Sequence, residues 1–280
     1  MAEITAAAVA KLREMTNVGM MDCKKALIET NGDLSAAVDL LRKKGIASAA
    51  NKAGRTSREG IIAQFIAPGA RVGVLVEINC ETDFVARNDL FRTFGEDVAK
   101  KLAENPAVDL EADRVAAFTK LRENIKIARS HRIEVSGNGL VAAYIHTGAK
   151  VGVLVEVTAG KESTVACEEF KQLVKDITLQ IAAGSPSVVS REQVNVDVLN
   201  KEREIAAAQF KDKPPQAIAK IVEGKLEKFF QTYCLVDQAF VKKNGEITVK
   251  EHLAATAKAL GDELSIRRFV RFQVGETPLV

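Results

Sequence analysis

The middle of the chain contains a long internal repeat, which constrains the possible folds more than any other feature. The run GIIAQFIAPGARVGVLVE, which begins at Gly60, returns as GLVAAYIHTGAKVGVLVE at Gly139, 79 positions later (139 − 60). In both runs two apolar segments flank a short turn that contains glycine, a pattern typical of a β-hairpin. The similarity continues into the helix that follows each hairpin, so the sequence predicts a duplicated α+β unit.

A further segment of each copy repeats at a larger distance. Residues 127–135 correspond to 266–274, an offset of 139 (266 − 127), so the second copy is 60 residues longer (139 − 79). The extra residues fall at about 195–243 and predict two helices, at 196–210 and 216–235, with a proline-containing turn at 212–215. Such a pair forms a thin antiparallel hairpin, a short coiled coil. A structural arm and a contact arm for a partner or a second copy of the chain fit this pattern equally.

The N-terminal residues predict a separate helical module. Helices are expected at 5–15, 20–30 and 34–44, with the last one ending at Gly45. Three short helices with tight glycine turns resemble the ubiquitin-associated type of fold. Apolar residues at helical spacing predict one shared core, made of Val9, Leu12, Met15, Ala26, Leu27, Val38 and Leu41.

Together these patterns predict an α+β protein with an N-terminal three-helix module and two duplicated subdomains. Each subdomain is expected to hold a small antiparallel sheet. In the first subdomain, helices are expected at 89–103 and 110–127, with a closing strand at 131–135. The predicted parts are, in chain order, the helical module 1–52, a linker 53–59, core subdomain 1 at 60–138 and core subdomain 2 at 139–280.

The connection after the first hairpin has different residues in the two copies, although the sequences on both sides of it correspond. Residues 79–89 read NCETDFVARND, and Phe84 and Val85 lie there between polar residues. A strand-to-helix connection usually lies at the protein surface. In the second copy Phe84 corresponds to Ser163, so the shared scaffold does not need an aromatic ring at this position. This favours Phe84 as a residue that contacts a partner.

Composition and charge argue against several classes of protein. Lys and Arg number 40 against 37 Asp and Glu, which is too balanced for a protein that coats nucleic acid. The four cysteines are widely spaced and are not grouped with the three histidines, so no zinc site, disulfide framework or cofactor is expected. The N-terminus lacks the pattern of a secretion signal, and no apolar run has the length of a membrane span. These features favour a cytoplasmic protein, with a processed organellar one as the alternative.

Two other function classes remain as alternatives. An enzyme would use Cys80 as its nucleophile, but the sequence shows no acid–base set beside it, and His131 or His146 could reach it only through tertiary contacts. We therefore expect no enzymatic activity, and the absence of a P-loop predicts that the chain does not bind a nucleotide itself. A nucleic-acid-binding module would use basic residues such as Arg55 and Arg58, but it lacks an aromatic stacking platform.

The motifs as a set resemble the elongation factor Ts family of bacteria. The resemblance rests on TNVGMMDCKKALIETNGD at 16–33, CETDFVARN at 80–88, the duplicated GVLVE hairpin and the inserted helices, and it covers nearly the whole chain. The family is the guanine-nucleotide exchange factor for elongation factor Tu, the GTPase that carries aminoacyl-tRNA to the ribosome. The resemblance therefore implies this GTPase as the partner.

The resemblance also implies roles for individual residues. Thr82, Asp83, Phe84 and Val85 match the family's TDFV motif, whose Asp and Phe wedge against the GTPase domain and lead to displacement of its Mg²⁺ ion. Further partner contacts implied by the resemblance are Met20, Met21, Lys24 and His146. Enterobacterial members continue past the last strand with a C-terminal helical module, so contacts from that module are expected to be absent here.

Overall fold

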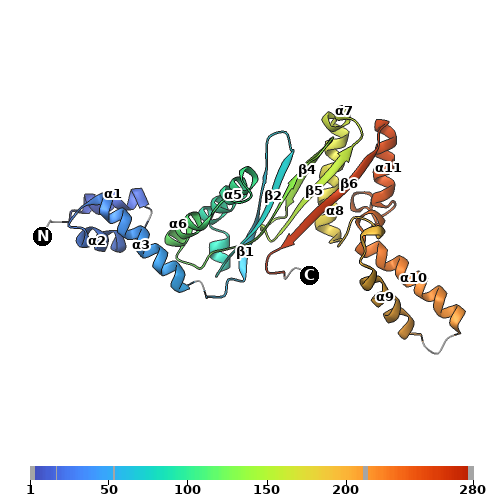
Figure 1. Cartoon of the computed structure of the whole chain (residues 1–280), viewed down its shortest axis with the longest axis horizontal. Coiled ribbons are helices and arrows are strands. Elements are labelled where there is room, and N and C mark those ends of the chain that lie inside the picture. The colour runs from blue at the N-terminus through green and yellow to red at the C-terminus, as the bar shows by residue number, and fades with distance from the viewer. Residues whose placement is uncertain (1–3, 17, 53, 211–213, 277–280) are drawn as a thin grey trace. The chain divides into compact units, whose positions relative to one another are not determined.

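The computed structural model describes residues 4–16, 18–52, 54–210 and 214–276. It combines helices with two small antiparallel sheets of three strands each (Figure 1), so the predicted α+β fold is confirmed. By compactness the chain divides into two units, Met1–Ala63 with Val76–Ser130 and Val274–Val280, and Gln64–Leu75 with His131–Gln273. The domain boundaries given above stay predictions.

Three helices form the N-terminal part of the first unit: α1 (Ala6–Thr16), α2 (Met20–Glu29) and α3 (Leu34–Lys52). Polar side chains cap two of them. The Thr5 hydroxyl accepts a hydrogen bond from the Ala8 N–H at 3.2 Å, and the Asp33 carboxylate accepts one from the Ala36 N–H at 3.0 Å. The helices share a core made of Val9, Leu12, Val18, Cys23, Ala26, Leu27, Ala37 and Leu41.

The prediction that Met15 belongs to this core is wrong, because its side chain is 59% exposed. The buried residues of α1 are Val9 and Leu12, and the half-buried Thr16 follows on the same face one helical turn later. The Thr16 hydroxyl donates to the Leu12 carbonyl at 2.7 Å.

The prediction that the third helix ends at Gly45 is also wrong, since α3 continues to Lys52. Gly45 instead permits a close approach to α6 (Glu111–Leu121). A Cβ atom at Gly45 would lie 2.6 Å from the Thr119 hydroxyl of α6, closer than such atoms pack. One turn later Ala49 is buried against α6, so this face of α3 is a helix–helix contact.

The first sheet has the strand order β1–β2–β3, with β1 (Glu59–Ile66), β2 (Val72–Cys80) and β3 (Lys126–Glu134). Between β2 and β3 the chain forms α4 (Asp83–Ala86), α5 (Asp89–Glu104) and α6. Helix α5 is strongly amphipathic, and its apolar face buries Phe91, Val98, Ala99 and Leu102.

The predicted helix 110–127 is too long, because α6 ends at Leu121 and β3 begins at Lys126. Arg122 ends the helix in the left-handed conformation, with φ 63°, and its N–H donates to the Phe118 carbonyl at 2.7 Å. Glycine is the usual signal for such a helix end, and the sequence has Arg122 rather than glycine at this position.

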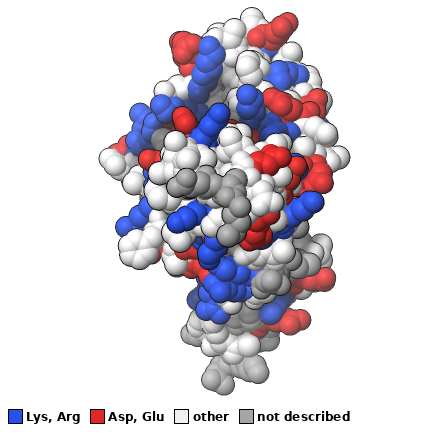
Figure 2. All heavy atoms as spheres, turned by 90° about the vertical axis from the view of Figure 1, so that its left-hand side faces the viewer, with Lys and Arg blue, Asp and Glu red and all other residues white. Residues whose placement is uncertain are grey.

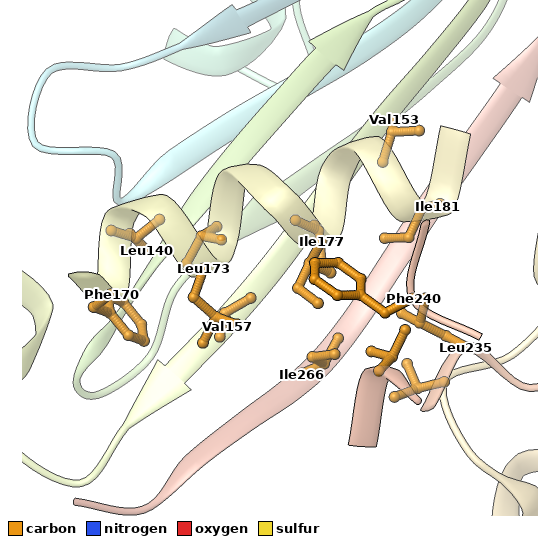
Figure 3. Packing of buried hydrophobic residues seen from close by; sticks show 14 residues of the cluster. Leu140, Val153, Val157, Phe170, Leu173, Ile177, Ile181, Leu235, Phe240 and Ile266 are labelled. Atoms are coloured by element: carbon orange, nitrogen blue, oxygen red, sulfur yellow. The ribbon is translucent and has the colours of Figure 1, made fainter. Parts of the chain in front are cut away.

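The second sheet is antiparallel with the order β4–β5–β6, formed by β4 (Gly139–Ile145), β5 (Val151–Ala159) and β6 (Leu264–Gln273). After β5 come α7 (Glu162–Ala166) and α8 (Glu168–Gly184), and α11 (Val249–Leu260) precedes β6. Helix α8 packs along this sheet (Figure 3), where Phe170, Leu173, Ile177 and Ile181 meet strand residues and Phe240. This cluster is the core of the second unit.

The residues inserted in the second copy form the predicted helical pair, α9 (Val196–Ala208) and α10 (Pro215–Tyr233). Residues 212 and 213 of the predicted turn lie outside the described residues. Within the second unit the pair extends away from the sheet (Figure 1). At its base the Arg191 guanidinium pairs with Glu227 and Asp237, both at 2.8 Å. The short helices nearby are Arg191–Gln193, Leu235–Asp237 and Val241–Lys243.

Corresponding backbone positions of the two copies have the same geometry. The hairpin turns place Ala70 and Ala149 at φ 52° and 56°. A Cβ atom at Gly60 would lie 2.2 Å from the Ile78 carbonyl oxygen, and one at Gly139 would lie 2.6 Å from the Val157 carbonyl oxygen. Each hairpin therefore begins with a glycine because the opposite strand leaves no room for a side chain.

No helix in the described part of the chain combines the length and the apolar character that crossing a bilayer requires.

We predict that Gly60→Ala lowers the free energy of unfolding by about 2 kcal/mol or more, since the new methyl group collides with backbone rather than with a movable side chain. Gly54→Ala is the matched control, because a Cβ atom there meets nothing within 4 Å. It should change the free energy of unfolding by less than about 0.5 kcal/mol. Urea denaturation followed by circular dichroism measures both. Equal urea midpoints for the two variants would show that the methyl group at position 60 is accommodated without a clash.

We also predict that stability falls as the pH drops below about 6.5, the usual pKa of histidine. His252 stacks on Phe240 with ring centroids 4.3 Å apart. Burial lowers the pKa of His252, with Lys242 and Lys243 acting in the same direction and Asp176 opposing them. Because the folded-state pKa is the lower one, the contribution of neutral His252 is present above pH 6.5 and is lost as the pH falls toward the folded-state pKa.

Thermal denaturation at pH 7.5 and pH 5.5 tests this prediction. The melting temperature of His252→Gln should fall less between pH 7.5 and pH 5.5 than that of the unmodified protein. An unchanged difference would assign the pH dependence to other groups.

Candidate functional site

The TDFV segment forms the single turn of α4 between β2 and α5. Thr82 is its N-cap, in extended conformation, and the Thr82 hydroxyl accepts a hydrogen bond from the Val85 N–H at 3.3 Å. Asp83 follows at the first helical position, where a negative charge suits the helix dipole, and its carboxylate pairs with Arg87 at 2.9 Å. The local sequence Thr-Asp therefore starts the helix as capping rules predict.

This short helix turns one small residue inward and one aromatic residue outward. Ala86 is buried, whereas the Phe84 side chain is 82% exposed. Among the large exposed apolar side chains in the described residues, Phe84 has the highest exposed fraction. A ring in this position contributes nothing to the core of its own unit, and its apolar surface is available to another molecule.

A carboxylate from the turn between α6 and β3 holds the backbone just before α4. Glu123 accepts hydrogen bonds from the Glu81 N–H at 2.9 Å, the Thr82 N–H at 3.0 Å and the Thr82 hydroxyl at 2.6 Å. Because these donors lie directly before the first helical residue, Glu123 fixes where α4 begins.

A second carboxylate makes the reciprocal contact. Glu81 accepts a hydrogen bond from the Asn124 N–H at 2.7 Å and lies 3.3 Å from the Arg55 guanidinium. The pKa of Glu81 is lowered, first by the hydrogen bond from Asn124 and further by Arg55. Asn124 is buried, and its amide donates to the Arg55 carbonyl at 2.8 Å. The segment before α4 and the turn that carries Glu123 are thus joined by hydrogen bonds in both directions.

Sequence reasoning missed Glu123 and Asn124. The one available signal was the repeat, because Glu123 and Asp262 are 139 positions apart (262 − 123), the offset of the closing strands. Both are acidic residues just before the third strand of their sheet.

The corresponding connection in the second copy keeps the scaffold and lacks the aromatic ring. Helix α7 starts after Lys161, which makes no side-chain capping bond, and Ser163 is exposed. Asp262 accepts a hydrogen bond from the Lys161 N–H at 2.9 Å. The pKa of Asp262 is lowered, mainly by its hydrogen bond with the Thr164 hydroxyl.

The other predicted contact residues lie on exposed surfaces. On α2, Met20 is 56% exposed, Met21 is 63% exposed and Lys24 is also exposed. These three belong to the same unit as Phe84, whereas the exposed His146 belongs to the other unit. The Tyr144 hydroxyl lies 3.0 Å from the His146 Nδ1 atom. The structure does not test whether these residues contact a partner, so their roles stay predictions.

An ion pair links α2 to the turn that carries Glu123. Asp22, on α2 between Met21 and Lys24, pairs with the guanidinium of Arg122. The Arg122 carbonyl also accepts a hydrogen bond from the Lys52 ammonium of α3 at 2.8 Å. The turn is therefore tied to both the N-terminal helices and the TDFV segment.

The structure places Cys80, the candidate nucleophile of the enzyme alternative, inside the fold. Cys80 is fully buried and its thiol donates to the Thr82 carbonyl at 3.2 Å, so it is not placed to attack a substrate at the surface. No group of three His, Cys, Asp or Glu side chains in the described ranges could hold a metal ion. On the face shown in Figure 2, Lys and Arg side chains are interspersed with Asp and Glu.

We predict that Phe84→Ala leaves the free energy of unfolding within about 0.5 kcal/mol of the unmodified value, as expected for an exposed side chain. Phe91, seven positions later on α5, is fully buried and provides the contrast. Phe91→Ala should cost about 3–5 kcal/mol. Urea denaturation measures both, and a large loss for Phe84→Ala would show that its ring supports the fold.

Comparison with known proteins gives one consistent answer. The family model described as elongation factor TS matches residues 81–276. Among curated proteins, elongation factor Ts of Nautilia profundicola is 44% identical over 291 positions, covering 99% of this chain and 94% of the relative. Elongation factor Ts of Symbiobacterium thermophilum is 45% identical over 285 positions, covering 99% and 93%. Elongation factor Ts of Clostridium novyi is 39% identical over 291 positions, covering 98% and 93%.

The match to the family model spans the TDFV connection, strand β3 of the first sheet, the whole second sheet and the inserted helices. The similarity to whole relatives extends it through the N-terminal helices. This chain therefore belongs to the elongation factor Ts family of translation elongation factors.

Proposed function

We propose that this protein is the guanine-nucleotide exchange factor for elongation factor Tu, acting in the cytoplasm. It binds the GTPase in its GDP form, displaces the bound Mg²⁺ ion and promotes release of GDP. Family membership supports the partner. The observation that carries the proposal is the Phe84 ring, 82% exposed on a firmly anchored turn of helix.

The proposed mechanism uses the way in which GTPases hold magnesium. Their Mg²⁺ ion is bound by a few protein ligands together with the nucleotide phosphates. A rigid apolar wedge that enters beside those ligands moves them, and the ion and the nucleotide then lose affinity together. Phe84 supplies the wedge, and Asp83, beside it on α4, brings a negative charge to the same place.

The energy required shows that Phe84 does not act alone. A population shift of about 10⁴-fold needs about 5.5 kcal/mol of differential binding. A buried aromatic anchor contributes about 2–4 kcal/mol. The remainder must come from other surfaces, for which we propose the exposed α2 residues Met20, Met21 and Lys24 in one unit and His146 in the other.

The coupling is reciprocal, so this protein and GDP weaken one another's binding to the GTPase. In a pull-down, elongation factor Tu bound to this protein should therefore be released by added GDP. A nucleic-acid-binding protein would instead show steep dependence on salt. Whether the α9–α10 hairpin contacts the GTPase or a second copy of the chain stays open in this proposal.

We predict that Phe84→Ala slows GDP release from elongation factor Tu by about 30-fold, which corresponds to about 2 kcal/mol of lost wedge contact. Elongation factor Tu loaded with mantGDP is mixed with excess GDP and with each variant, and the fall in fluorescence gives the release rate. Ser163→Ala, at the matching position of the second copy, should release GDP as fast as the unmodified protein. Release by Phe84→Ala at the unmodified rate would refute the wedge.

A further inference from the structure

We propose that Glu123 is a positioning residue that sets the orientation of Phe84 before the partner arrives. This inference rests on the exchange function proposed above. Glu123 does not touch the partner in this scheme, since it acts through the Thr82 cap and the first turn of α4.

The hydrogen bonds form a continuous chain from Glu123 to the helix that carries Phe84. One carboxylate oxygen accepts from the Glu81 and Thr82 N–H groups at 2.9 and 3.0 Å, and the other accepts from the Thr82 hydroxyl at 2.6 Å. That hydroxyl in turn accepts from the Val85 N–H at 3.3 Å. Phe84 lies between these two anchored residues, so its backbone is fixed on both sides.

The turn that presents Glu123 is itself held in place. Asn124 is buried and donates its backbone N–H to Glu81 and its side-chain amide to the Arg55 carbonyl. The Ser57 hydroxyl donates to the Asn124 carbonyl at 3.1 Å. The carboxylate of Glu123 therefore projects from a rigid support.

The second copy shows what the scaffold alone requires. Asp262 stands at the position of Glu123, one methylene shorter, and accepts from the backbone of the connection only at the Lys161 N–H among the described contacts. The first copy adds a second backbone N–H, that of Glu81, to this contact. A hydroxyl bonds the carboxylate in both copies, but in the first copy it belongs to the N-cap Thr82, and in the second to Thr164 inside α7. The additional N–H bond and the bond to the helix cap both occur in the copy whose short helix exposes an aromatic ring.

A helix of one turn is unstable by itself, because fixing its first turn costs more entropy than its hydrogen bonds return. Without Glu123 the first turn of α4, with its exposed Phe84 ring, would sample many orientations, and the partner would have to order it during binding. The surfaces elsewhere on the chain would still dock the GTPase. Loss of Glu123 should therefore lower the maximal rate of GDP release more than it raises the factor concentration needed for half of that rate.

The test measures mantGDP release from elongation factor Tu over a range of factor concentrations for the full chain. Glu123→Ala should lower the maximal rate roughly tenfold to a hundredfold, the range expected when a reacting group is misplaced by about 1 Å. The half-saturating concentration should change by less than about threefold, because docking uses other residues. Glu123→Gln should restore most of the rate, since its amide oxygen accepts from both N–H groups and its NH₂ donates to the Thr82 hydroxyl oxygen.

Asp262→Ala is the matched control. It removes the corresponding carboxylate from the second copy and should leave the maximal rate unchanged. Thermal denaturation of every variant records any loss of stability. A drop in rate for Asp262→Ala equal to that for Glu123→Ala would overturn the proposal, since it would trace the effect to general destabilisation.

A double-variant cycle separates positioning from stability. In a Phe84→Ala background, Glu123→Ala should not lower the maximal rate further, because no ring remains to be oriented, while its effect on melting temperature should persist. Additive losses in rate would overturn the positioning role. If Glu123→Ala keeps the full rate while Phe84→Ala is slow, only this inference fails. If Phe84→Ala is itself as fast as the unmodified protein, the proposed function fails.

Discussion

A buried carboxylate in the middle strand of each sheet, paired with an arginine of the third strand, is the interaction on which both sheets depend. Glu77 accepts from the Arg129 guanidinium at 2.7 Å, and Glu156, which is fully buried, accepts from the Arg268 guanidinium at 2.6 Å. A buried charge without its partner costs about 3–5 kcal/mol, so each strand pair strongly disfavours a shift in register. The third strand arrives from far along the chain, and this pairing fixes where it docks.

The same pairing explains how a large insertion fits into one copy only. The arginines are 139 positions apart (268 − 129) and the glutamates 79 (156 − 77), so the added residues all lie between the middle and the third strand. Any inserted segment must therefore end so that β6 can still place Arg268 against Glu156. In the first copy Glu77 also accepts from the Gly275 N–H at 2.9 Å, so the segment after β6 is held by the first unit's own buried carboxylate.

Upon this shared scaffold each copy carries different surface residues. The first copy exposes Phe84 after its middle strand, where the second has Ser163. The second copy places His146 at the start of its hairpin turn, where the first has Ala67, and both N–H groups bond across the turn at 2.9 Å. Because of the duplication, each candidate contact residue has a counterpart in the other copy with the same backbone geometry but a different side chain.

Much of this arrangement could be predicted from sequence, because local signals and the repeat agree. Capping residues such as Thr5 and Asp33 gave helix starts, and Gly60 and Gly139 marked the strands. Two of the failures, at Gly45 and at Glu123, share one cause, which is a contact made from a distant part of the chain. Gly45 has the residue type of a helix end but serves a helix crossing, and Glu123 has the residue type of a surface turn but binds a segment about forty residues earlier.

Helix α10 has one further consequence for how this protein can change. Its residues include none that are buried, and α9 buries only Ala206, so the outer arm adds almost nothing to the core that holds β6 in place. The Arg191 pairs join the base of the arm to the rest of the unit, but they are partly exposed ion pairs and add little stability. The arm can therefore open by itself at a small free-energy cost and can lengthen, shorten or diverge over evolutionary time, while the sheets beneath it keep their register.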